Sequence, residues 1–142
     1  MVTLRAEEQV RAAAVADKDD ARIEAVRRRF PVPLTREYHH GIAILDVRLI
    51  DIPDAMNAPP EIAPGNRAFL ATGNRAITIM PLIRDRAAIG AISVIRLIAG
   101  ALSDKQLGIL QTFANQAVIA IENARLLNEL RESLQQQTAT TC

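Results

Sequence analysis

The feature that most constrains this chain is an uninterrupted helical stretch over residues 104–136. Ser103 and Gln106 fit a capping box, and no proline follows before the tail that begins with Gln135. About 30 residues of helix measure roughly 45 to 50 Å at 1.5 Å per residue. A compact domain of this length is only about 35 to 40 Å across, so we expect the helix to extend beyond its own domain.

Apolar side chains recur along this helix at alternating steps of three and four residues, which is the spacing of a coiled coil. The seam slips once between Ala124 and Leu127 and then resumes, and we hypothesise that this slip is a two-state element. The alternative is a single wide apolar face that packs on the parent domain. The seam predicts dimerisation through Leu110, Ala114, Ala117, Ile121, Ala124, Leu127, Leu130 and Leu134.

The clearest β signal is a pair of apolar runs, Arg75–Arg84 and Ala87–Leu97, joined by a short polar turn. The pair predicts a hairpin, although the turn residues Asp85 and Arg86 are not a preferred tight-turn pair. Both runs are apolar on both faces, which predicts a sheet that is covered on both sides. Pro81 lacks a backbone donor and therefore predicts a sheet edge or a bulge at that point.

The first half of the chain is predicted less sharply. Residues 1–30 favour helix by local propensity, with Asp19 or Asp20 capping a helix over 21–29. Further along, the sequence predicts a short helix from Thr35 to about Leu45, a strand over Val47–Ile52, an irregular loop over 53–66 that holds four prolines, and a helical turn around 66–72.

Composition and charge exclude several classes of function. Seventeen basic residues balance sixteen acidic ones, and aromatic residues make up 3% of the chain. A net charge of +1 and few aromatic rings argue against nucleic-acid binding and against attraction to an anionic membrane. The single cysteine is Cys142, and the N-terminus has no apolar signal-peptide core, so the sequence predicts a reducing, cytoplasmic setting.

From residue 75 to 138 the chain resembles the C-terminal half of a GAF domain, of the kind found in bacterial sensor histidine kinases and nucleotide cyclases. Three motifs carry the resemblance in order: Met80-Pro81-Leu82, the strand IGAISV over Ile89–Val94, and the helix that contains FANQAVIAIENA. The segment VRLIDIPD over Val47–Asp54 also resembles the strand that precedes the pocket loop in this family.

The resemblance implies an α+β, PAS-like fold with a six-stranded antiparallel sheet, helices on both faces and a long C-terminal helix. The resemblance also predicts that Gln9–Ala16 is an early strand, whereas local propensity predicts a helix there. On this basis the chain lacks the first helix and strand of the family, so its N-terminus looks truncated and a sheet edge is exposed. We divide the chain into a core, 1–103, and a dimerisation and signalling helix with its tail, 104–142.

In such domains a small molecule binds between the sheet and the helices and loop that map here onto 36–66. A pocket filled by aliphatic side chains is the alternative. His39 and His40 are adjacent on a predicted helix and point about 100° apart, so they cannot share a metal, and we expect them at the surface or in a loop. The predicted ligand-binding residues are Tyr38, His39, Asp54, Thr78, Met80 and Ser93.

No catalytic constellation is visible: the sequence has no phosphate loop and no recognisable paired carboxylates. The sulfoxide reductases and bilin-binding proteins of this fold need a pocket cysteine, and the Asn-Lys-Phe-Asp-Glu signature of cyclic-nucleotide binders is missing. We therefore predict a non-enzymatic sensor module with no cofactor or metal, a homodimer that signals through its helix to a kinase or cyclase domain. The alternative is a ligand-free dimerisation or spacer module.

Overall fold

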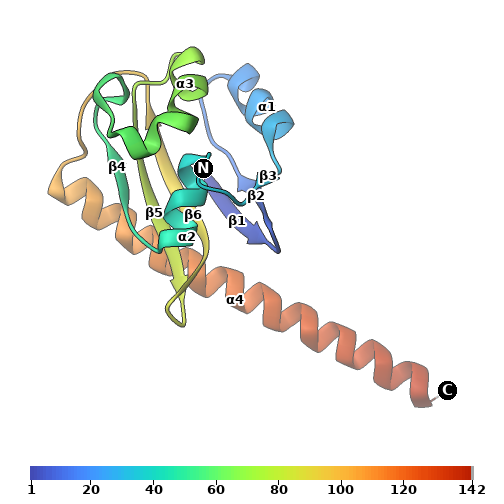
Figure 1. The fold of residues 1–142 in the computed structure, drawn as a ribbon. Helices are drawn as coiled ribbons and strands as arrows, with labels where there is room; N and C mark the ends of the chain where they lie inside the picture. The colour runs from blue at the N-terminus through green and yellow to red at the C-terminus, as the bar shows by residue number, and fades with distance from the viewer. Residues whose placement is uncertain (142) are drawn as a thin grey trace.

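The computed structural model describes residues 1–141, while Cys142 lies outside the described residues. Its centre is a six-stranded antiparallel sheet with the strand order β3-β2-β1-β6-β5-β4 (Figure 1). This is the α+β fold that the sequence predicts. The strands are β1 (Val2–Ala6), β2 (Gln9–Ala14), β3 (Val32–Pro33), β4 (Ile50–Ile52), β5 (Ala76–Arg84) and β6 (Ala87–Arg96).

Helices cover both faces of the sheet, as the two-sided apolar pattern of β5 and β6 predicts. The helices α1 (Asp20–Arg29), α2 (His39–Asp46) and α3 (Ala63–Ala71) lie on one side, and α4 (Asp104–Thr141) crosses the other (Figure 1). Two short 3-10 helices, η1 (Ala55–Asn57) and η2 (Pro60–Ile62), lie within the proline-rich segment. The loop predicted over 53–66 is therefore more ordered than expected, because α3 already begins at Ala63.

Alternation along β5 divides its side chains between two apolar cores. Ile77 and Ile79 are buried with residues of α2 and α3, whereas Met80 and Leu82 are buried with Leu110 of α4. Successive side chains of a strand point to opposite faces, so one strand supplies both cores. Phe69 is the one aromatic residue of the buried sets, and the cores are otherwise built almost wholly from aliphatic side chains.

The predicted β5–β6 hairpin is confirmed, with Asp85 and Arg86 at its turn. Both residues have positive φ, 51° and 70°, as a two-residue hairpin turn of type I′ requires. Pro81 pairs with Ala91 of β6, but it lies beyond the short β4, which pairs only with 77–79 of β5. The missing N–H of Pro81 therefore falls where β5 has a free edge, as predicted.

The N-terminal residues are strands, so the helix that propensity favours over residues 1–16 is wrong. β1 and β2 form a hairpin, and β1 pairs on its other side with β6. The expected loss of the family's first strand is also wrong, because the sheet has six strands. A Cβ at Gly90 of β6 would lie 2.2 Å from the Thr3 carbonyl oxygen, so glycine at the second position of IGAISV is what lets β1 pack there.

The helix over 21–29 is confirmed: α1 begins at Asp20, and the Asp19 side chain accepts a hydrogen bond from the Ala21 N–H. The next two elements are shorter than predicted. Thr35 caps a turn at Glu37, and α2 begins only at His39. Val47 adopts a left-handed conformation that ends α2, so the following strand begins at Ile50 instead of Val47.

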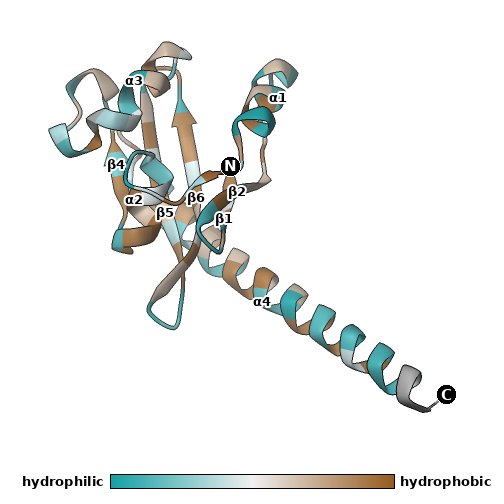
Figure 2. Cartoon of the chain, turned by 45° about the vertical axis from the view of Figure 1, so that its right-hand side comes forward, coloured by the Kyte–Doolittle hydropathy of each residue, from teal (hydrophilic) through white to brown (hydrophobic). Residues whose placement is uncertain are grey.

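The long helix is present and longer than predicted. Ser103 and Gln106 form the expected capping box: the Gln106 N–H donates to Ser103 Oγ, and the Ser103 N–H donates to Gln106 Oε1. α4 then continues to Thr141 and projects far beyond the sheet (Figure 2). Among the described residues, no helix combines the length and apolarity needed to cross a lipid bilayer.

The predicted seam of α4 divides at the point where the helix leaves the sheet. Leu110 and Ala114 are buried in the domain's own core, and Ala117 and Ile121 are partly buried against it. The later members are solvent-exposed: Ala124, Leu127, Leu130 and Leu134. The slip in the seam therefore marks the end of intramolecular packing, and the first half of the seam faces the chain's own sheet.

Candidate functional site

A cavity of about 700 Å³ lies between α1 and the sheet face that carries α2 and α3. Its walls are mainly apolar: Val26 and Phe30 from α1 and its end, Phe69 from α3, and Ile77 and Ile95 from the sheet. α1 has no buried residue, so it covers the cavity without packing tightly on the sheet. A largely apolar hollow of this size with a few polar groups is typical of small-molecule sites.

Arg22 closes one end of the cavity by joining α1 to the segment between α3 and β5. Its Nη2 donates a 2.5 Å hydrogen bond to Asn74 Oδ1, and its Nε donates to Asp17 Oδ2 at 3.2 Å. The carboxylate of Asp17 thus already has a cationic partner, and the backbone N–H of Asp19 and the Arg22 guanidinium lower its pKa. Arg22 and Asp17 therefore form a structural pair at the rim.

Both histidines are buried, which corrects the expectation that they lie at the surface or in a loop. His39 is 6% and His40 8% exposed, because α2 lies against β5 and β6 and turns both residues inward. Burial lowers the pKa of His39 to about 4, with a further contribution from the Arg29 charge. Burial, the neighbouring His39 and other positive charges lower the pKa of His40 to about 3. Both imidazoles are therefore neutral near pH 7.

His40 is held in place by the sheet. Its Nε2 lies 3.2 Å from Ser93 Oγ on β6, and Phe30 meets its ring edge-on with the centroids 6.0 Å apart. Ser93 is itself fixed, because the Ser93 N–H donates to the Met1 carbonyl at 2.8 Å. His40 is thus a satisfied core histidine that anchors α2 to the sheet at the cavity.

His39 differs from its neighbour, because its Nε2 is buried without a hydrogen-bond partner in the structure. The ring packs edge-on against Phe69, with centroids 5.2 Å apart, and both residues line the cavity. An unpaired buried polar nitrogen costs about 1 to 3 kcal/mol. Such an atom at the wall of a cavity is the most direct structural indication of a ligand-binding site in residues 1–141.

The structure brings three of the six predicted ligand-binding residues to the cavity: Tyr38, His39 and Ser93. Thr78 and Met80 lie elsewhere, because they alternate with Ile77 and Ile79 along β5 and face the α4 side. Thr78 donates a hydrogen bond to Asp51 Oδ1 at 2.8 Å and accepts one from Arg96 at 3.1 Å.

Asp54 is also absent from the cavity. Its side chain accepts a hydrogen bond from the Met56 N–H at 3.0 Å and another from the Asn57 side-chain amide at 2.8 Å, so it caps η1. This is the turn-capping role that aspartate after proline favours. Asp54 therefore supports the proline-rich segment and does not face the cavity, to which residues 53–66 contribute Gly65.

Sequence reasoning missed the cavity residues supplied by α1, in particular Arg22 and Arg29. Arg27, Arg28 and Arg29 lie in the last turn of α1, where cations favourably meet the helix dipole, and nothing in their spacing distinguishes Arg29, the one that lines the cavity. Among residues 1–141, no three His, Cys, Asp or Glu side chains are grouped as a metal site would need.

Comparisons with known proteins identify the family and the fold of the chain. The family model of the GAF domain matches residues 3–121. No curated protein matches the sequence significantly. Three solved structures illustrate the fold similarity, and at 15 to 20% identity they show the fold alone.

A domain described as part of a two-component sensor histidine kinase protein from Sinorhizobium meliloti 1021 has a TM-score of 0.69 at 17% identity, covering 92% of this chain and 82% of that one. The GAF-B domain of DevS from Mycobacterium smegmatis has a TM-score of 0.63 at 20% identity, with coverage of 91% and 82%. The type II free methionine-R-sulfoxide reductase from Thermoplasma acidophilum has a TM-score of 0.64 at 15% identity, with coverage of 86% and 77%.

Proposed function

The chain belongs to the GAF domain family, and on that basis we propose that it is a cytoplasmic sensory module that binds a small molecule in the cavity between α1 and α2. The observation that carries the proposal is the buried, unpartnered Nε2 of His39 at the wall of that cavity. A pocket that had collapsed onto aliphatic side chains would leave neither the space nor the unpaired nitrogen. The ligand-free spacer module is the alternative.

Native mass spectrometry of the gently purified protein separates these two functions. The sensor predicts a reproducible extra mass on each chain, and Ala25→Trp, which fills the cavity from α1, is expected to abolish it. Val94→Trp is a poorer choice, because Val94 belongs to a paired strand. If the wild-type protein carries no extra mass in repeated preparations, so that Ala25→Trp has none to abolish, the spacer is favoured.

We propose no catalytic role for this cavity. The reductase among the similar structures shows that this fold can carry an enzyme, and the family resemblance assigns that chemistry to pocket cysteines. Among residues 1–141 the cavity is lined by apolar side chains, the two neutral histidines, the charged residues Asp17, Arg22 and Arg29, and a few uncharged polar residues such as Tyr38, Asn74 and Ser93. The one cysteine of the sequence, Cys142, lies outside the described residues. Binding with release of the unchanged ligand is the activity that such a lining supports.

The second part of the proposal is a homodimer joined along α4. The exposed face of this helix carries a heptad stripe, offset from the face that packs on the sheet, in which Gln116 and Asn123 are polar and the other members are apolar. Its steps alternate between four and three residues with no slip, over more than three heptads. The stripe consists of Ile109, Phe113, Gln116, Ala120, Asn123, Leu127, Leu130 and Leu134.

Exposure supports this stripe as the dimer face. The large apolar side chains exposed on α4 include Ile109, Phe113, Leu127, Leu130 and Leu134, all of which are members. Two others, Ile119 and Leu126, occupy the flanking positions that widen a coiled-coil seam. A second copy of the same helix would bury this face, and the polar Asn123 within it would fix the register. We propose that the joined helices carry the signal to a kinase or cyclase output domain.

The double variant Leu127→Lys/Leu130→Lys is expected to convert the dimer to a monomer. Two leucine side chains per helix are lost from the seam, and four like charges face one another across it. Sedimentation equilibrium at micromolar concentration measures the change, with an expected weakening of association of at least about a hundredfold from the loss of roughly 3 kcal/mol.

Asn128→Lys/Gln135→Lys is the matched control, because it adds the same charge one residue outside the stripe. It should remain dimeric. If both double variants associate like the wild type, or if the wild type is monomeric at these concentrations, the dimer face is assigned incorrectly.

A further inference from the structure

We infer that the ligand of this cavity is a small monoanion with an apolar body, whose carboxylate or equivalent group binds between Arg29 and His39. The inference rests on the proposed function and names the chemical class that the site would take. Its evidence is the balance of charge in the cavity, the two polar groups left without partners, and the apolar remainder of the wall.

The balance of charge in the cavity is positive. The charged groups of the lining are Asp17, Arg22, Arg29 and the α-amino group of Met1. Asp17 and Arg22 neutralise each other in the ion pair at the rim. Both histidines are neutral near pH 7, and the wall contains no second carboxylate. Burial lowers the pKa of the Met1 α-amino group, which already donates a hydrogen bond to the Ser93 carbonyl oxygen at 2.9 Å, so Arg29 is the cation left for a ligand. A cationic ligand would therefore find no free counter-charge among the described residues, whereas a single negative charge would be compensated.

Arg29 is the cation available to such a ligand. Across residues 1–141, no carboxylate lies within ion-pairing distance of its guanidinium, whereas Arg28 beside it has a weak pairing with Glu24 at 3.9 Å. The Arg29 charge is close enough to both imidazoles to lower the pKa of His39 and of His40. An arginine that lines a cavity and has no carboxylate partner is suited to bind the carboxylate of a ligand, which it can hold with two parallel hydrogen bonds.

His39 supplies the second contact. Its Nε2 is buried and unpartnered, and a neutral imidazole can donate from that nitrogen to an anionic oxygen. Arg29 and His39 both line the cavity, so one anionic group bound at that wall can approach both side chains. The carboxylate would thus satisfy the buried, unpaired nitrogen of His39 and pair with the guanidinium of Arg29, an exposed side chain that has no carboxylate partner among residues 1–141.

The rest of the wall selects an apolar body. Val26, Phe30, Phe69, Ile77 and Ile95 surround the space, and the sheet side offers few polar groups beyond Ser93, which already bonds His40. A phosphate group or a sugar on the ligand would have few hydrogen-bonding partners on this wall, and burying unpaired polar groups is costly. The cavity of about 700 Å³ is large enough for an aryl or branched aliphatic acid.

The test uses three probes of one shape: 3-phenylpropanoate, 3-phenylpropanamide and 3-phenylpropan-1-amine. Isothermal titration of the full chain at pH 7 is expected to show the carboxylate binding about tenfold or more tightly than the amide, and no binding of the amine. In Arg29→Gln the preference for the carboxylate over the amide should disappear while the amide still binds.

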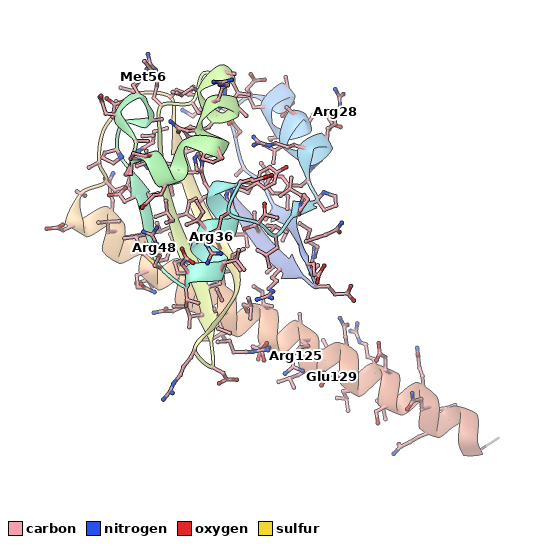
Figure 3. The ribbon with its side chains drawn as sticks, viewed as in Figure 1. Arg28, Arg36, Arg48, Met56, Arg125 and Glu129 are labelled. Carbon is pink, nitrogen blue, oxygen red and sulfur yellow. The ribbon has the colours of Figure 1, made fainter. Side chains whose placement is uncertain are left out.

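Arg28→Gln is the matched control, since it removes one charge from the neighbouring position. Arg28 does not line the cavity, and Figure 3 shows its side chain pointing away from the domain on the outer side of α1. It should keep the full preference for the carboxylate. Equal losses in Arg29→Gln and Arg28→Gln would mean a general effect of charge and would overturn the inference.

An independent measurement follows the His39 ring by NMR. A carboxylate beside His39 offsets the Arg29 charge and stabilises the imidazolium, so the pKa of His39 should rise when 3-phenylpropanoate binds and stay unchanged with the amide. In His39→Phe, carboxylate affinity should fall while the thermal transition remains cooperative. An unchanged His39 pKa in the saturated complex would overturn the inference.

The probes also separate this inference from the proposed function. Binding of the amide at least as tightly as the carboxylate overturns the monoanion but leaves a ligand-binding sensor. Binding of none of the three, together with a reproducible co-purified mass, overturns the ligand class alone. Binding of none, together with an empty protein in native mass spectrometry, contradicts both.

Discussion

Gly41→Ala is expected to destabilise the domain by about 3 kcal/mol or more, the upper end of what overpacking costs. A Cβ at this position would lie 1.9 Å from the carbonyl oxygen of Thr35 and 2.9 Å from its carbonyl carbon. Both are backbone atoms of the turn that leads into α2, so no side chain can move aside to make room. The helix must shift away from that turn and carry His39 and His40 with it.

Gly108→Ala is the matched control for this substitution. Gly108 also lies in a helix, but a Cβ there meets no atom within 4 Å. Alanine is a better helix former, so this variant should gain about 0.5 to 1 kcal/mol. Urea unfolding monitored by circular dichroism measures both. A Gly41→Ala variant as stable as the wild type would contradict the described approach of α2 to the Thr35 turn.

Acidification is expected to destabilise the domain already at pH values well above those at which most carboxylates titrate. The pKa values of His39 and His40 fall from 6.5 in the unfolded chain to about 4 and about 3 in the folded protein. Below pH 6.5 the unfolded chain binds protons that the folded state does not, so stability is complete above that pH and falls as pH decreases. The loss stops only below the folded pKa values.

The expected size of this effect is large. Between pH 6.5 and 4.5 each histidine loses roughly 2 to 3 kcal/mol of stabilisation, since one pH unit is worth 1.36 kcal/mol. Two such losses are a large part of the stability of an ordinary domain, which is about 5 to 15 kcal/mol. The exposed carboxylates with lowered pKa, Asp17 and Glu122, contribute only at lower pH.

His39→Phe tests the assignment of this acid loss. Phenylalanine keeps the edge-on contact with Phe69 but cannot be protonated, so urea unfolding at pH 7 and 4.5 should show about half the wild-type difference. His40 remains in this variant and accounts for the other half. A pH dependence equal to that of the wild type would show that folding does not lower the pKa of His39.

The elements that could be predicted from sequence are those with a strong local pattern. The capping box at Ser103, the long helix and the hairpin around Asp85 are all present because propensity, capping and hydrophobic pattern agree there. β1 and β2 could not be predicted from propensity. Each has a single buried residue, Thr3 and Val10, so pairing with β6 and β3 decides their structure, and alanine and arginine give no local strand signal.

The candidate site was predictable as a region but only partly by residue. Tyr38, His39 and Ser93 reach the cavity, whereas Thr78 and Met80 do not, because a shift of one position along a strand exchanges the two faces. Whether Arg29 faces the cavity depends on where α1 packs against the domain. The burial of His39 and His40 depends on the close approach of α2 to the Thr35 turn, which Gly41 permits. These are tertiary facts that have no signal in the spacing of the residues.

Amide hydrogen exchange with and without saturating 3-phenylpropanoate tests most directly whether the cavity and the helix act together as a sensor. The ligand is expected to slow exchange in α1, which covers the cavity with no buried residue of its own. It should also change exchange in α4 over 110–121, where the helix packs on the opposite face of the sheet. Slower exchange in α1 with α4 unchanged would contradict a signalling role. No change in either helix, at a concentration where titration shows the probe to be bound, would contradict the ligand site itself.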